Sequence, residues 1–333
     1  MIFLKGDFAM PIIDLHVDTL LLLQRRDNSG DLYTNQNTSL DIEKMKIGNY
    51  MAQFFAMYLE PEADMEKDNI ERVSRHQLLE NMMDSFYENL DANSSHIAYA
   101  GSYSDLIKNN EKGLISAFLT IEDGAIIDGS MDKIKYYYDK GVRLITLTWN
   151  FENCFGYPNS TDRNIMERGL KPFGKEAIEY MNELGIIIDV SHLSDGGFYD
   201  VLEISKKPFT ASHSNARAIT PHQRNLTDDM IKKLANAGGV TGLNFCNSFL
   251  SERDETHSYI SDMVLHLNHL KNKGGEDFVA LGSDYDGISN TVEVSGPHEM
   301  EKLFDALSKA KWTARQIDKL SHLNALRFIK DSL

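Results

Sequence analysis

The sequence predicts an α/β protein of the (β/α)8, or TIM, barrel class, and three observations support this. Short apolar, β-branched segments alternate with longer amphipathic segments along the chain, the pattern of parallel strands joined by helices. Eight such apolar segments occur, the number that closes a parallel barrel. The first of them ends in His16-Val17-Asp18-Thr19 without glycine, whereas an open dinucleotide-binding sheet has a glycine-rich turn there.

The predicted strands are near-continuous apolar runs, as expected of strands that are covered on both faces. They are Ile12–Asp18, Met51–Tyr58, Leu114–Ile121, Arg143–Trp149, Ile186–Ser191, Phe209–His213, Val240–Phe245 and Phe278–Ser283. The predicted helices have helical periodicity, and several are preceded by capping Ser or Thr residues or followed by Gly. They are Met65–Leu90, Met131–Lys140, Phe173–Leu184, a segment from Ser194 to Ser205, Asp228–Ala237 after Thr227, Tyr259–Asn272, and a final helix from Thr313 through Ile329.

Composition predicts one domain, over residues 1–333, because no Pro-, Gly- or Ser-rich linker divides the chain. A formal charge of −16, from 34 basic and 50 acidic residues, argues against binding to nucleic acid or to anionic membranes. The two cysteines, Cys154 and Cys246, are too few for a disulfide framework in a chain of this length, so we expect two free thiols and a cytoplasmic location, with a single disulfide as the alternative.

The N-terminal segment does not have the features of a signal peptide or of a membrane span. It has a Gly-Asp interruption and lacks a small-residue cleavage site after a long apolar run. The apolar run from Pro11 to Leu23 contains Asp14, His16 and Asp18, which are incompatible with a lipid-spanning helix.

Polar residues at the carboxyl ends of the predicted strands are the candidate site, because barrel enzymes place their reactive groups there. These residues are imidazoles and carboxylates, the usual ligands of zinc and similar divalent metals. They are His16, Asp18, Glu122, His192, His213 and Asp284.

His16 and Asp18 lie two residues apart, so both side chains are expected on one side of the strand, with Asp14 one step deeper. Capping of the strand by His16 and of a following helix by Asp18 is the alternative. Glu122 ends a strongly apolar strand and is either a helix cap or a carboxylate that bridges two cations.

His192 and His213 each follow a serine at the end of successive strands, and this repetition favours metal ligands over isolated core histidines. Asp284 ends the last strand, a position that suits a general base for a metal-activated water. Asp286 is expected to be a turn residue, although the two aspartates could exchange these roles. Arg224 is a candidate to bind a substrate carboxylate, and a loop salt bridge is the alternative.

Together these motifs resemble the membrane (renal-type) dipeptidase family, peptidase family M19 of the amidohydrolase superfamily. The resemblance runs from about Pro11 to Leu333 and depends on five motifs. They are Asp14-x-His16-x-Asp18, Glu122-Asp123-Gly124, Asp189-Val190-Ser191-His192, the stretch from Ser212-His213-Ser214-Asn215-Ala216-Arg217 to Arg224-Asn225-Leu226, and Gly282-Ser283-Asp284-Tyr285-Asp286-Gly287.

The resemblance implies a binuclear zinc centre and a dipeptide substrate. His16 and Asp18 would bind one zinc ion, His192 and His213 the other, and Glu122 would bridge them. It also implies that Asp284 handles the proton and that Arg224 binds the C-terminal carboxylate of a dipeptide, whose C-terminal residue can be a D-residue. A homodimer is a further implication.

Trp149 departs from the family pattern, in which many members have His after Thr-Leu-Thr at this strand end. An indole donates one hydrogen bond and does not change charge. Trp149 therefore donates to the substrate in place of His, shapes the pocket, or belongs to the core.

The expected reaction is hydrolysis of the peptide bond of a dipeptide by metal-activated hydroxide, with Asp284 transferring the proton to the leaving amine. The first alternative is a non-peptidase amidohydrolase, such as a lactonase, deaminase or phosphotriesterase-like enzyme, on a small carboxylate-bearing substrate. The second is a barrel without activity that only binds a ligand or metal, but all six expected ligand and base positions are filled.

Overall fold

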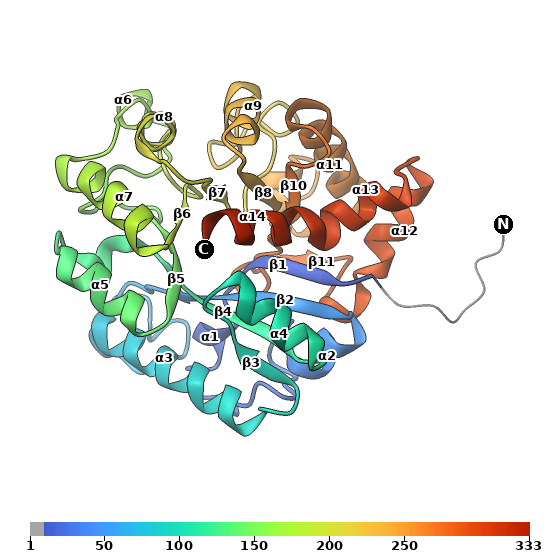
Figure 1. Ribbon diagram of the computed structural model, residues 1–333, viewed down its shortest axis with the longest axis horizontal. Coiled ribbons are helices and arrows are strands. Elements are labelled where there is room, and N and C mark those ends of the chain that lie inside the picture. The colour runs from blue at the N-terminus through green and yellow to red at the C-terminus, as the bar shows by residue number, and fades with distance from the viewer. Residues whose placement is uncertain (1–9) are drawn as a thin grey trace.

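A closed parallel barrel surrounded by helices forms the protein, as seen in a computed structural model that describes residues 10–333 (Figure 1). Within these residues the main sheet has nine strands, and the pairing of β2 with β4 closes eight of them into a ring, while β3 pairs with β4 outside it. The predicted (β/α)8 barrel is confirmed. The barrel strands are β1 (Ile12–Val17), β2 (Tyr50–Tyr58), β4 (Ile115–Glu122), β5 (Val142–Thr146), β6 (Ile187–Asp189), β7 (Thr210–Ala211), β8 (Val240–Leu243) and β10 (Val279–Leu281).

Each predicted strand exists, but most are shorter than predicted. The largest shift of a strand end is at β5, which ends at Thr146 instead of Trp149 because its partner β6 ends at Asp189, where the two are in register. Three short strands were not predicted from the sequence. They are β3 (Ile97–Tyr99) and the two-residue pair β9 (His257–Ser258) and β11 (Thr291–Val292).

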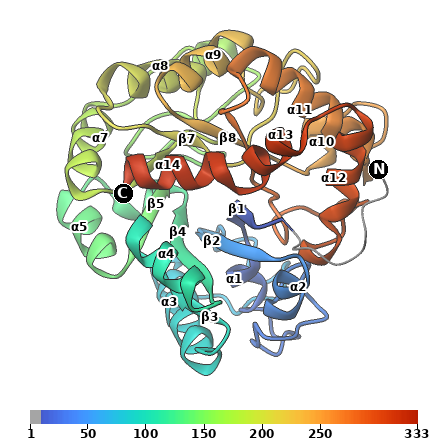
Figure 2. The same ribbon diagram turned by 45° about the vertical axis from the view of Figure 1, so that its right-hand side comes forward.

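The helices pack on the outside of the barrel and connect its strands (Figures 1 and 2). The longer ones are α3 (Arg75–Ala92), α4 (Tyr103–Glu111), α5 (Met131–Asp139), α7 (Pro172–Leu184), α8 (Asp195–Ile204), α9 (Asp228–Asn236), α11 (Ile260–Gly274), α12 (Glu301–Lys309) and α14 (Asn324–Ser332). Shorter turns of helix are α1 (Thr19–Leu22), α2 (Ile42–Ile47), α6 (Arg163–Met166), α10 (Asn247–Leu250), α13 (Ala314–Asp318), the 3₁₀ turns at Gly124–Ile127 and Pro297–Glu299, and a π turn at Lys319–Leu323.

Capping explains where the predicted helices begin. The side chains of Ser194 and Thr227 accept hydrogen bonds from backbone N–H groups in the first turns of α8 and α9, as predicted. The predicted helix Met65–Leu90 is wrong in its first ten residues, because Asn69 has a φ of 61° that a helix does not allow and Ser74 caps the helix that follows.

The barrel interior is apolar at one end, which α14 closes. Ile13, Phe54, Phe118 and Val240 from four strands pack in one cluster with Phe328 of α14. This helix crosses the barrel between the strands and solvent (Figure 2). Since α14 covers the end where the strands begin, the open end is the one where they finish.

Closer to the open end of the barrel, the strand backbones approach one another closely and the buried side chains are polar. A Cβ atom on Gly242 or Gly282 would lie 1.9 or 1.8 Å from the carbonyl oxygen of Ser212, so neither position accepts a side chain. Thr146 and Asp189 occupy the same layer and are fully buried. This layer supports the groups at the mouth.

No helix among residues 10–333 is long and apolar enough to cross a lipid bilayer. The signal-peptide prediction concerns residues 1–9, which lie outside the described part of the chain. Cys154 and Cys246 are free thiols, as expected from the sequence.

Candidate metal centre

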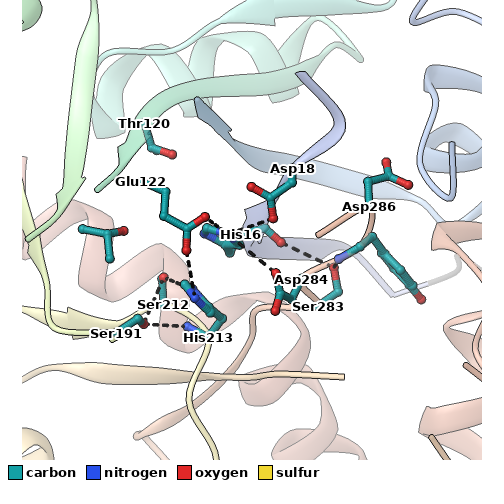
Figure 3. A network of polar contacts seen from close by, with 12 residues as sticks. His16, Asp18, Thr120, Glu122, Ser191, Ser212, His213, Ser283, Asp284 and Asp286 are labelled. Atoms are coloured by element: carbon teal, nitrogen blue, oxygen red, sulfur yellow. Dashed lines mark hydrogen bonds and ion pairs between the residues drawn. The ribbon is translucent and has the colours of Figure 1, made fainter. Parts of the chain in front are cut away.

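Six of the predicted site residues converge at the open end of the barrel, although their strands are far apart in the sequence. Glu122 lies at the centre of this group (Figure 3). Its Oε1 atom lies 3.2 Å from Nε2 of His192 and 3.4 Å from Nε2 of His213. Its other oxygen, Oε2, lies 3.5 Å from Nε2 of His16. One carboxylate therefore faces imidazoles on both of its oxygens.

A second group of ligand atoms surrounds His16. Its Nε2 atom lies 3.3 Å from Oδ2 of Asp18 and 3.8 Å from Oδ1 of Asp284. Asp18 directly follows β1 and precedes α1, where its side chain makes no capping hydrogen bond. Asp18 thus occupies the N-cap position of α1, as the alternative expected, but its carboxylate faces His16 and does not cap the helix. The carboxylate of Asp14, the residue expected one step deeper, accepts hydrogen bonds from the backbone N–H groups of His16 and Ser283.

The spacing of these atoms fits divalent cations. Two ligands at about 2.0–2.1 Å from a tetrahedral zinc ion lie about 3.3 Å from each other. Groups of His16, Glu122 and His213, and of His16, Asp18 and Asp284, each place one ligand atom per residue within 4.8 Å of the others. The distances around Glu122 are close to this spacing.

Unsatisfied polar atoms support the same interpretation. Among residues 10–333, the two ring nitrogens of His16 and Oδ1 of Asp18 are buried without a hydrogen bond. Buried polar atoms are rarely left without a partner, so such a group indicates a missing ligand. The residues present therefore fit a binuclear metal site of imidazoles and carboxylates.

The charges of the cluster are strongly perturbed. Burial lowers the pKa of His192 well below its usual value, with a further contribution from Arg224, and burial also lowers the pKa of His213. Both rings are therefore neutral near pH 7, the form that binds metals. At His16 burial is outweighed by the carboxylates of Asp18 and Glu122, which raise its pKa well above the usual value. A positive charge is thus favoured between these carboxylates.

Hydrogen bonds to Nδ1 orient the two histidines. Nδ1 of His192 lies 3.0 Å from Oδ1 of Asn150, and Nδ1 of His213 lies 2.7 Å from Oγ of Ser212. The Ser212 hydroxyl donates to Asp189, so it accepts from His213. Each Nδ1 therefore carries the proton, and each Nε2 has a free lone pair directed at Glu122.

Asp284 and Asp286 have different surroundings. Oδ2 of Asp284 accepts a hydrogen bond from Asn244 (2.8 Å), and Oδ1 faces His16. Asp286 points away from the cluster in Figure 3 and accepts hydrogen bonds from the Thr19 hydroxyl and the backbone N–H of Ser39 (both 2.6 Å). The surroundings of Asp286 match the expected turn residue.

Backbone strain accompanies two of the site residues. His192 has a φ of 66° and Asp284 a φ of 62°, in the left-handed region that costs non-glycine residues on the order of 1 kcal/mol. This conformation turns both side chains toward the mouth immediately after their strands.

A cavity of about 570 Å³ opens above the cluster. Asp18, Glu122, His192 and Asp284 form part of its wall, together with Trp149. The Trp149 ring packs 5.0 Å from the ring of Tyr58 and 6.1 Å from that of His192. Trp149 is therefore a half-buried wall residue beyond the end of β5 that also packs against the hydrophobic core, and its three expected roles stay predictions.

Arg224 lies beside the cluster without a carboxylate partner among residues 10–333. It is 5% exposed, and its guanidinium makes only long hydrogen bonds, of 3.3 Å to Ser214 Oγ and 3.4 Å to the His213 carbonyl. Its Nε is buried without a hydrogen bond, and its Cζ atom lies 5.2 Å from the ring centroid of Phe249, which lines the cavity. The alternative of a loop salt bridge is wrong for Arg224. Arg217 makes that contact instead, with Asp195 at 2.7 Å.

Sequence reasoning missed the residues that hold the site in place. Asn150, Asn244 and the Asp189–Ser212 pair orient the histidines and Asp284. A signal for three of them was available, because Asn150, Ser212 and Asn244 lie within one residue of predicted strand ends, where the candidate ligands were also found.

Known proteins resemble this chain in sequence over most of its length. The family model described as membrane dipeptidase (peptidase family M19) matches residues 8–332. An uncharacterized dipeptidase of Schizosaccharomyces pombe is 31% identical over 96% of this chain and 80% of its own length. An uncharacterized protein of Klebsiella pneumoniae is 34% identical over 69% of this chain and 87% of its own length.

Solved structures extend the similarity to the whole fold. A metallopeptidase from Rhodobacter sphaeroides, with a bound phosphinate mimic of the dipeptide L-Ala-D-Ala, superposes with a TM-score of 0.87 at 26% identity. The superposition covers 98% of this chain and 100% of that one. A dipeptidase of family M19 gives a TM-score of 0.86 at 26% identity, covering 98% of this chain and 99% of the other.

Proposed function

Because this chain belongs to the membrane dipeptidase family, peptidase family M19, we propose that it is a zinc-dependent dipeptidase that hydrolyses the peptide bond of dipeptides. One observation carries the proposal most directly. Glu122 faces His16 with one carboxylate oxygen and His192 and His213 with the other, at 3.2–3.5 Å. Such spacing suits a carboxylate that bridges two cations.

The proposed ligands divide into two sets that share Glu122. His16 and Asp18 would hold one zinc ion, and His192 and His213 the other. When bound, the two cations would polarise the scissile carbonyl group and lower the pKa of a water molecule toward about 7. The neutral rings of His192 and His213 are ready for this role without losing a proton.

Asp284 is the proposed general base and acid. Its Oδ2 atom is held by Asn244, so the second oxygen, Oδ1, is left to face the cluster and the cavity. This oxygen would accept a proton from the attacking water and donate it to the leaving amine. The left-handed backbone at Asp284 supports this direction of the carboxylate.

Arg224 is the proposed anchor for the C-terminal carboxylate of the dipeptide. Its guanidinium is buried, it has no carboxylate partner among residues 10–333, and burial lowers its pKa. A buried cation with long hydrogen bonds gains stability from a bidentate carboxylate. The ligand of the Rhodobacter sphaeroides relative, a mimic of L-Ala-D-Ala, favours a small dipeptide and agrees with a D-residue at the C-terminal position.

Trp149 is proposed to bind the substrate through its indole N–H, which donates to no acceptor among residues 10–333 and belongs to a side chain of the cavity wall. The single domain, the homodimer and the cytoplasmic location expected from the sequence stay predictions.

The test is a dipeptide assay coupled to metal analysis. The purified protein is expected to contain about two zinc ions per chain and to hydrolyse L-Ala-L-Ala or L-Ala-D-Ala. Dialysis against a chelator should abolish the activity, and added zinc should restore it. Full activity after complete metal removal would reject the proposal. Hydrolysis of lactones or phosphotriesters without hydrolysis of any dipeptide would favour the alternative amidohydrolase function.

A further inference from the structure

A buried carboxylate outside the metal cluster lines the same cavity. Glu60 lies two residues after the end of β2, and its side chain contributes to the cavity wall. The residue is only 7% exposed. Within the described residues 10–333, no side chain or backbone group donates a hydrogen bond to this carboxylate, and none forms an ion pair with it.

The nearby cations are already paired with other carboxylates. Arg75 contacts Asp123 at 2.8 Å, Arg25 contacts Asp27 at 3.2 Å, and Lys67 pairs with Asp64. None of these three cations forms an ion pair with Glu60.

The surroundings make this charge costly in the absence of a ligand. Burial, together with the carboxylates of Asp68 and Asp64 in the same cavity wall, raises the pKa of Glu60 to about 7, against a smaller lowering by Arg75 and Lys67. A cationic group bound at this place would relieve both the burial and the repulsion. Glu60 is therefore suited to bind a cationic group of a ligand.

The barrel order places Glu60 opposite Arg224. The ring runs β1, β2, β4, β5, β6, β7, β8, β10 and back to β1. Glu60 follows β2 and Arg224 follows β7, so three strands separate them in either direction. A negative and a positive group thus lie on opposite sides of the mouth, with the metal-ligand cluster between them, which matches the two charged ends of a dipeptide.

We infer that Glu60 binds an ammonium or guanidinium group on the N-terminal residue of the substrate and selects dipeptides that carry a positive charge there. This inference rests on the proposed dipeptidase function. The cation has two sources, the α-ammonium group of the dipeptide and a basic side chain of its first residue.

The experiment compares kcat/KM of the wild type, Glu60→Gln and Glu62→Gln for two pairs of substrates. Glu62 is an exposed carboxylate nearby that does not line the cavity, so Glu62→Gln is the matched control. Lys-Ala and norleucyl-Ala differ in the side-chain cation, and Ala-Ala and propionyl-Ala differ in the α-ammonium group.

A selective loss supports the inference, and its pattern identifies the source of the cation. If the side chain is bound, Glu60→Gln lowers kcat/KM about tenfold more for Lys-Ala than for norleucyl-Ala. If the α-ammonium group is bound, the same excess appears for Ala-Ala over propionyl-Ala. An equal factor for all four substrates, or the same selective loss in Glu62→Gln, overturns the inference.

A binding measurement separates this inference from the proposed function. Calorimetry measures the affinity of phosphinate dipeptide mimics that begin with lysine or norleucine, each with and without a free amino group, for the wild type and Glu60→Gln. One outcome is that the wild type hydrolyses no dipeptide but binds the cationic mimics more tightly than the neutral ones, and that Glu60→Gln lacks this preference. That outcome rejects the dipeptidase function and supports the Glu60 inference. Affinities that change equally for all mimics overturn it.

Discussion

The Nε2 atoms of His192 and His213 face each other at 3.1 Å. Each ring is held from behind at Nδ1, by Asn150 and by Ser212. Two neutral imidazoles whose lone pairs point at one place cannot satisfy each other, because neither Nε2 carries a proton. The pair is therefore arranged for a third atom that accepts both lone pairs.

Removal of one of these imidazoles is expected to remove a metal ion. In His213→Ala, zinc measured by mass spectrometry should fall from about two ions per chain to one or fewer. The rise in melting temperature on zinc addition should shrink in parallel. His298→Ala, a change at an exposed histidine, is the control and should keep the full zinc content. Unchanged zinc in His213→Ala would contradict the ligand assignment.

Asp284→Asn is expected to separate metal binding from catalysis. Asn can still accept the hydrogen bond from Asn244, so the fold and the zinc content should persist. Because the amide accepts no proton, kcat should fall about 10²–10⁴-fold. Asp286→Asn is the matched control, since Asp286 contacts Thr19 and Ser39 and points away from the cluster, and its kcat should stay within about threefold of wild type. A large fall of kcat in Asp286→Asn with little change in Asp284→Asn would instead assign the general-base role to Asp286.

Arg224→Gln is expected to lower kcat/KM for dipeptides about 10- to 100-fold, because a charged hydrogen-bond pair is lost. The same variant is assayed with the corresponding dipeptide amides, which lack the carboxylate. For these amides, kcat/KM should fall much less. Arg217→Gln is the control, since Arg217 is already paired with Asp195. Equal losses for acids and amides would show that Arg224 only supports the fold.

Trp149→Phe tests whether the indole N–H donates to the substrate. The ring keeps its contacts with Tyr58 and His192, but the donor is removed. A donor to the scissile carbonyl oxygen predicts a fall in kcat of about 100-fold with little change in KM. Trp149→His should recover part of this loss. A rise in KM at constant kcat would instead show that Trp149 only shapes the cavity wall.

His266 predicts a loss of stability in acid. Its Nδ1 accepts the backbone N–H of Ala216, and its Nε2 lies 2.9 Å from the Leu250 carbonyl, so the buried ring is neutral. Burial lowers its pKa from 6.5 to about 4. Between these values the unfolded chain binds a proton that the folded chain does not, so the free energy of unfolding falls as the pH falls, by about 3 kcal/mol at most.

Urea unfolding of the metal-free protein at pH 7 and pH 4.5 measures this effect. His266→Gln should lose less stability than the wild type over this interval, whatever its stability at pH 7. His298→Asn, at an exposed position, should lose as much as the wild type. If the free energy of unfolding has the same pH dependence in His266→Gln and wild type, His266 does not contribute to the loss of stability in acid.

The sequence predicted the barrel and the residues of its mouth because parallel strands have a simple signature. Buried strands are apolar throughout, and their carboxyl ends carry the reactive groups, so Glu122, His192, His213 and Asp284 could be identified without coordinates. Local capping at Ser194 and Thr227 could also be predicted, since a cap depends on neighbours three residues away.

Strand periodicity described β1 less well. Its pairing with β2 changes register between Asp14 and Val17, so side chains two residues apart need not share a face. His16 and Asp18 do meet, at 3.3 Å, but the Asp14 carboxylate accepts from the backbone of Ser283 on a neighbouring strand end. A bulge depends on the partner strand, which the local sequence does not reveal.

The residue types at the strand ends could be predicted from the order of residues in the chain, because the apolar runs mark those ends. Their distances, the orientation of the histidines by Asn150 and Ser212, and the absence of a carboxylate partner for Arg224 among the described residues follow from the folded arrangement. These features depend on contacts between residues far apart in the chain. Such contacts exist only once the ring of strands has closed.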